Sequence, residues 1–183
     1  DSVSTVHRPK RLPVTPSVLR IIKIEINRSF ISKHDKRLLW FVSTLAFHGS
    51  FRMGVLLSKN SSFFDPNVTL LGKHISLKTM LINTSYVDIL AISVKSPKTG
   101  KPNSTTIVDV FPTNNDLCPV KAYINWRNCT TSYNNSLPAF RFGSGLPLTS
   151  NYLNSQLKNW LARYLDFNVG YISCHSFRAG IPS

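Results

Sequence analysis

Residues 174–183 read CHSFRAGIPS, and this stretch decides how the rest of the chain is interpreted. His175 and Arg178 lie three positions apart, so a helical turn places the imidazole and the guanidinium side by side. Such a pair can bind one phosphate, because Arg donates two parallel hydrogen bonds and His adds a third. A lone His-x-x-Arg spacing also arises by chance in many proteins. The pair therefore gains meaning only from the residues that accompany it.

Charge points to a polyanionic partner. The chain has 183 residues, 42% of them hydrophobic, which suits a single globular domain. Its 22 Lys and Arg outnumber 8 Asp and Glu, giving a formal net charge of +14. Double-stranded DNA is the first expectation for the partner, and an anionic membrane surface is the second. No segment reaches the roughly 18 apolar residues of a membrane-spanning helix, so no membrane partner is expected.

Cysteine usage argues against disulfides and metals. Cys118, Cys129 and Cys174 are odd in number and widely spaced, without a Cys-x-x-Cys pair. Free thiols in an intracellular protein fit this pattern. We expect no metal site and no cofactor.

The first 13 residues differ in composition from the rest of the chain. Residues 1–13 combine two prolines with the basic residues Arg8, Lys10 and Arg11, and they are expected to form a basic arm or linker. The domain is expected to occupy residues 14–183.

Helical patterns alternate with one stretch of strands. Capping residues and apolar spacing predict helices over 16–28, from 32–35 to 49, over 119–128 and over 150–164, with a last one starting near 173. Lys33, Lys36 and Arg37 lie in the polar first turns of the second helix. Trp126 and the apolar residues of 153–164 are expected in the core.

Short β-branched runs predict a small antiparallel sheet over 68–77, 86–94 and 105–111. Residues 96–102 read SPKTGKP, a turn sequence that places Lys98 and Lys101 at the tip of a basic hairpin, with Lys95 just before it. The expected fold is therefore a mostly α-helical α+β domain with a small three-stranded antiparallel sheet inserted among helices.

Four basic side chains follow one another in a distinctive order: Arg52 after a Gly at a helix end, Lys98 on the hairpin, then His175 and Arg178. This order resembles the catalytic domain of tyrosine recombinases, from about residue 11 onward. The phrases RLPVTP (11–16), FRMG (51–54), KTG (98–100), CPV (118–120) and HSFRAG (175–180) are most similar to recombinases of eukaryotic mobile elements of the Crypton and DIRS kind.

The resemblance implies a chemistry. Arg52 and Arg178 would bind the non-bridging oxygens of a phosphorane transition state, and His175 would donate a further bond or move the proton of the nucleophile. Lys98 would protonate the departing 5′ oxygen. In the family a tyrosine attacks, forming a 3′-phosphotyrosine link without metal or ATP, and tetramers assemble on DNA. A nuclear location is expected. The predicted DNA-contacting residues are Arg8, Lys10, Arg11, Lys33, Lys36, Arg37, Lys95 and Lys101.

Other interpretations stay open at this stage. Arg52 also suits a role at the C-terminal carbonyls of the preceding helix, and Lys95 or Lys101 are alternatives to Lys98 as the active lysine. Val55 stands where the family usually has a carboxylate.

The family's nucleophilic Tyr lies beyond His-x-x-Arg, so the chain is expected to be C-terminally incomplete and inactive alone. A degenerate recombinase fold that only binds DNA is the alternative function. A basic RNA-binding structural protein, suggested by charge alone, is a third.

Overall fold

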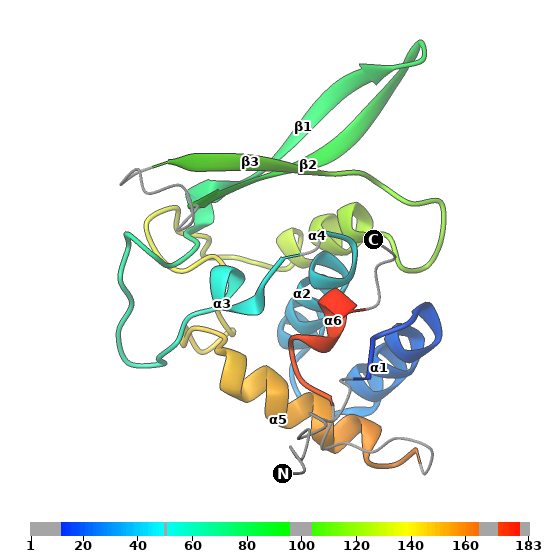
Figure 1. Cartoon of the computed structure of the whole chain (residues 1–183). Coiled ribbons are helices and arrows are strands. Elements are labelled where there is room, and N and C mark those ends of the chain that lie inside the picture. Colours follow the sequence, from blue (N-terminus) through cyan, green and yellow to red (C-terminus); the bar gives the residue numbers. More distant parts are fainter. Residues whose placement is uncertain (1–11, 50, 96–103, 165–171, 180–183) are drawn as a thin grey trace, which may run out of the picture.

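The chain alternates helices with a single small sheet (Figure 1). The computed structural model describes residues 12–49, 51–95, 104–164 and 172–179. Its helices are α1 (Pro16–Arg28), α2 (Lys33–Gly49), α3 (Met53–Leu56), the short 3-10 helix η1 (Gly72–His74), α4 (Pro119–Arg127), α5 (Ser150–Leu161) and α6 (Ser176–Ala179). Its strands are β1 (Ile75–Ile82), β2 (Ser85–Lys95) and β3 (Thr105–Val110). This architecture confirms the predicted fold class.

Local capping signals fix the starts of two long helices. Thr15 caps α1 by accepting a hydrogen bond from the Val18 N–H at 3.3 Å, and Pro16 occupies the first turn. Thr149 caps α5 in the same way, through the Tyr152 N–H at 3.2 Å. Both helix starts agree with the sequence prediction.

The core centres on α2, which contacts α1, α4 and α6. Phe41 of α2 is fully buried, and its ring lies 5.3 Å from Tyr123, 5.5 Å from Trp126 and 5.8 Å from Phe140. Aromatic pairs at these distances add stability beyond the area they bury. Trp126 is 1% exposed, which confirms its predicted core position.

The sheet is antiparallel in the order β1-β2-β3. Ile75 pairs with Ile92, and Leu90 pairs with Val110; these four side chains share one face and are buried in the core. The far end of the β1–β2 hairpin extends past the helices (Figure 1). At its turn Asn83 and Thr84 have positive φ values of 46° and 67°.

Two local expectations were wrong, and one helix was missed. The strand predicted over 68–77 begins only at Ile75, because Leu70 and Leu71 are buried against residues 137–139 instead: the Ala139 N–H donates to the Leu70 carbonyl at 2.9 Å. The last helix begins at Ser176 and not near 173. The four-residue α3 was not predicted. The predicted turn over 96–102 lies outside the described residues.

A buried carboxylate ties α1 to the end of α5. Glu25 is 2% exposed and accepts hydrogen bonds from Arg28 Nη1 at 3.3 Å, Arg163 Nη1 at 3.0 Å and the Tyr164 hydroxyl at 3.2 Å. Buried carboxylates persist when they are paired in this way. Because α5 precedes the segment that leads to α6, this contact helps to fix the C-terminal part of the fold.

Among the described residues, no helix is both long enough and apolar enough to cross a bilayer.

Candidate nucleic-acid interface

Arg52 projects to solvent because its neighbours are anchored. Phe51 is 6% exposed and Met53 is 3% exposed, so both side chains point into the core and the residue between them points out. A Cβ on Gly49 would overlap the ring of Phe51, which explains the glycine at the end of α2. Arg52 has extended backbone geometry and precedes α3. Within the described residues its guanidinium has no hydrogen bond or ion pair, so it is free to bind an anion.

His175 is exposed for the same reason. It lies between Cys174, 4% exposed, and Ser176 and Phe177, both 0% exposed. The turn is pinned on both sides: the Cys174 N–H donates to Asn154 Oδ1 at 2.6 Å, and the Val14 N–H donates to the Ser176 carbonyl at 2.9 Å. The core thus holds the backbone at His175 while leaving its imidazole in solvent.

Arg178 lies inside α6, one helical turn after His175. The structure describes its backbone. Helix α6 packs on α2, the helix whose C-terminal end leads to Arg52 (Figure 1). The two parts of the predicted site therefore depend on the same central helix.

Two of the three basic residues of α2 that were predicted to contact DNA have intramolecular partners. Lys36 Nζ donates to the Asn27 carbonyl at 2.8 Å, and Arg37 Nη1 donates to the Asn125 carbonyl at 3.0 Å. These carbonyls lie in the last turns of α1 and α4, where a positive charge is favourable. Lys33 is exposed. Sequence reasoning missed these contacts, because they join residues far apart in the chain.

Lys95 ends β2, and its ammonium donates to the Pro66 carbonyl at 3.2 Å. The remaining predicted site residues lie outside the described residues: Lys98 and Lys101 on the expected hairpin, and Arg8, Lys10 and Arg11 in the expected arm.

Val55 is half-buried in α3, and its N–H donates to the Arg52 carbonyl at 2.8 Å. An aliphatic side chain thus stands one turn from Arg52, where it supplies no hydrogen-bond acceptor for the guanidinium.

Burial shifts three titratable groups near these elements. It lowers the pKa of His48, whose Nε2–H donates to the Leu117 carbonyl at 2.9 Å. It also lowers the pKa of His74, with smaller contributions from Lys73 and Lys95. Burial raises the pKa of the Cys174 thiol to about 12, so this free cysteine stays protonated at neutral pH.

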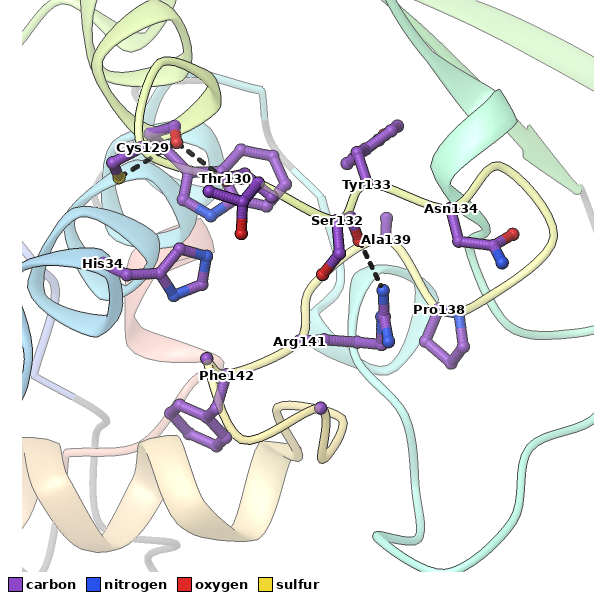
Figure 2. Close-up of a pocket in the computed structure, with 14 residues that line it drawn as sticks. His34, Cys129, Thr130, Ser132, Tyr133, Asn134, Pro138, Ala139, Arg141 and Phe142 are labelled. Atoms are coloured by element: carbon purple, nitrogen blue, oxygen red, sulfur yellow. Dashed lines mark hydrogen bonds between the residues drawn. The ribbon is translucent and has the colours of Figure 1, made fainter.

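A pocket of about 170 Å³ lies between the start of α2 and residues 129–145. Figure 2 shows the side chains of His34, Thr130 and Ser132 directed toward this space. His34 Nδ1–H donates to Asp35 Oδ1 at 2.9 Å, and the same oxygen accepts the Gly143 N–H at 2.8 Å. None of the predicted site residues lines this pocket.

Comparisons at the level of sequence gave nothing: no protein-family model and no curated protein matches the chain.

Solved structures do match. A Flpe mutant in complex with a DNA Holliday junction superposes with a TM-score of 0.52 at 13% identity, covering 89% of this chain and 38% of that protein. An Flp recombinase–Holliday junction complex gives 0.52 at 14% identity, with 88% and 37% covered. The XerH site-specific recombinase in a pre-cleavage complex with its difH substrate gives 0.50 at 17% identity, with 93% and 42% covered.

The chain spans 37–42% of the length of these recombinases. At such low identity the likeness concerns the fold. The chain has the fold of tyrosine recombinase catalytic domains.

Proposed function

We propose that this chain is the DNA-binding catalytic domain of a tyrosine recombinase, which cuts and rejoins DNA strands through a 3′-phosphotyrosine link. The observation that carries the proposal is a fold shared, over about nine tenths of the chain, with recombinases solved on DNA substrates. The net charge of +14 supports the same partner. Positive charge favours DNA because each neutralised phosphate releases counterions.

The chemistry rests on groups that can bind a phosphorane. Arg52 and His175 are exposed, and their backbone is held by buried neighbours. We assign Arg52 and Arg178 to the non-bridging oxygens, where charge develops in the transition state. His175 handles the proton of the nucleophile, and Lys98 protonates the departing 5′ oxygen. The nucleophilic tyrosine is not among the residues that this proposal assigns.

The finer assignments belong to the same proposal. The phrases quoted above support a mobile-element recombinase of the Crypton or DIRS kind, acting in the nucleus. Assembly into tetramers on paired DNA sites follows from the family resemblance.

Duplex binding is the first test. Fluorescence anisotropy with a labelled DNA duplex should give an affinity that falls steeply as salt rises, because several phosphates are contacted at once. A matched RNA duplex should bind more weakly. Salt-independent binding, or tighter binding to RNA, would contradict the proposal.

Strand joining tests the catalytic groups without a tyrosine. A DNA strand with a 3′-phosphoryl p-nitrophenyl ester imitates the phosphotyrosine intermediate. The 5′ hydroxyl of a second strand, annealed beside it, attacks phosphorus; the new P–O5′ bond replaces the P–O aryl bond, and p-nitrophenolate leaves. The hydroxyl proton passes to Lys98 in its neutral form, the reverse of the cleavage step.

Arg52→Ala should slow this joining by about 10²- to 10³-fold, the typical cost of removing one transition-state donor. His175→Ala should slow a phenyl ester much more than the p-nitrophenyl ester, since only the poorer leaving group needs a proton. Lys158→Ala, an exposed change on α5, is the matched control. Equal rates for wild type and Arg52→Ala would refute the catalytic assignment.

A fold that only binds DNA is the second candidate function, favoured by Val55. Without a carboxylate beside Arg52, the guanidinium lacks one group that would orient it. This candidate predicts normal duplex affinity with no joining by the wild type, and Arg52-dependent joining by the wild-type chain would count against it.

A further inference from the structure

Three basic side chains gather where β2 ends. Lys73 and His74 belong to η1, which contacts β2, and Lys95 is the last residue of β2. The register places them together: Ile75 pairs with Ile92, so η1 lies beside the last residues of β2 (Figure 1). Of the three, only Lys95 is predicted from the sequence to contact DNA.

His74 presents a fixed donor. Its Nδ1 accepts the Leu71 N–H at 3.0 Å, which leaves the proton of the neutral ring on Nε2. Burial, Lys73 and Lys95 all lower the pKa of this imidazole, so the ring is neutral at physiological pH. Nε2–H then donates without adding charge, and it has no partner among the described residues.

The two ammonium groups are not neutralised. Lys73 is exposed, and in the described part of the chain its ammonium has no ion pair. Lys95 uses one N–H on the Pro66 carbonyl, and its other two have no partner among the described residues. The neighbouring Asp65 accepts the Asn67 N–H at 2.8 Å, and in the ranges that the structure describes no ion pair joins it to Lys95.

We propose that Lys73, His74 and Lys95 form a phosphate-binding cluster, which holds one backbone phosphate of duplex DNA at the end of β2 where Lys95 pairs with Thr105 of β3. Two cations and one neutral N–H donor suit a phosphodiester, which carries a single negative charge on two non-bridging oxygens. This inference rests on the proposed function. It adds a contact that anchors DNA at the end of β2, made by residues other than Arg52 and His175.

Salt dependence of duplex binding tests the cluster in the intact chain. The slope of log affinity against log salt falls by about 0.9 for each phosphate that the protein no longer neutralises. Lys73→Ala and Lys95→Ala should each reduce the slope by up to that amount. In the double variant the slope should also be reduced by only about 0.9, because both lysines bind the same phosphate. A reduction of about 1.8 in the double variant would overturn the single-phosphate arrangement.

The histidine gives an independent readout. His74→Ala should weaken binding by about tenfold, the worth of one hydrogen bond to a charged group, without changing the salt slope. His74→Gln retains an N–H donor and should recover part of that affinity. A reduced salt slope in His74→Ala would overturn the neutral-donor role.

Lys158→Ala is the matched control, because Lys158 is exposed on α5 and its ammonium has no partner within the described ranges. If it changes the slope as much as Lys73→Ala, net charge explains the effect and the cluster is refuted while DNA binding stands. If the wild type shows no salt-dependent duplex binding, the proposed function fails, and the cluster fails with it. Thermal unfolding of each variant separates weaker phosphate binding from unfolding of the domain.

Discussion

Replacing Phe177 with Ala is expected to release α6 while the rest of the domain stays folded. Helix α6 has four residues, too few to be stable without tertiary contacts. Phe177 is 0% exposed, and with Ile172 and Cys174 it anchors the 172–179 segment in the core. The Val14 N–H donates to the Ser176 carbonyl, a hydrogen bond that also breaks when the segment is released.

The size of the effect follows from the burial of the ring. Truncating a buried Phe to Ala costs about 3–5 kcal/mol. Since about 1.4 kcal/mol corresponds to a factor of ten, the opening equilibrium of this segment should rise by about two to three and a half orders of magnitude.

Cys174 reports the opening directly. Its thiol is buried, and its pKa is raised to about 12, so it reacts with an alkylating reagent only after the segment opens. The labelling rate of Cys174, followed by mass spectrometry of its peptide, should rise by the same factor in Phe177→Ala. Cys118, 7% exposed at the start of α4, is the internal reference and should change little.

Phe140→Ala is the matched control variant. Phe140 is 2% exposed, and its ring packs on Phe41 and Trp126 outside the 172–179 segment. Its truncation should lower global stability by a similar amount and accelerate both buried thiols together. The reasoning fails if Cys174 labelling stays unchanged in Phe177→Ala, or if both variants accelerate the two thiols equally.

Three further changes test the fold. Thr84→Gly should stabilise the protein by about 1 kcal/mol and raise Tm by about 2–4 °C, because Gly adopts the positive φ of 67° without strain; no rise in a thermal scan would contradict this. Glu25→Gln should cost about 1–3 kcal/mol in urea unfolding, since three donors lose a carboxylate, while Asp109→Asn, whose partner is exposed, should be nearly neutral. The lowered pKa of His48 means that the unfolded state binds more protons, so stability is complete above about pH 6.5 and falls as pH drops below it. His48→Gln should flatten that part of the Tm–pH curve, and an unchanged curve would contradict it.

The long helices could be predicted because their signals are local. Thr15, Pro16 and Thr149 act within one turn of their own positions, and the structure shows the capping bonds that the sequence pattern implied. The apolar spacing of 153–161 likewise placed Leu153, Leu157 and Leu161 in the core, where each is 0% exposed.

The first strand could not be placed because its signal depends on distant residues. Leu70 and Leu71 look like strand residues, yet they are buried by the 137–139 segment, and β1 continues to Ile82 through side chains that are largely exposed. Hydrophobic pattern alone does not distinguish a strand from an apolar loop that a remote segment covers.

Part of the candidate site could likewise be predicted from the sequence, and part could not. The order of Arg52, His175 and Arg178 was visible in the sequence, and the exposure of Arg52 and His175 came with the structure. The contacts of Lys36 and Arg37 with the ends of α1 and α4 were invisible beforehand, because each spans elements that meet only in the folded chain.

The alternation of buried and exposed residues around positions 52 and 175 also bears on how such a domain evolves. The fold depends on the buried Phe51, Met53 and Phe177, whereas the proposed chemistry depends on the exposed residues between and beside them. Under the proposed function, a single codon change at 52 or 175 would remove the chemistry and leave a folded, positively charged protein that a genome can retain for another use. A change at 177 acts differently, because it releases from the core the helix that carries Arg178.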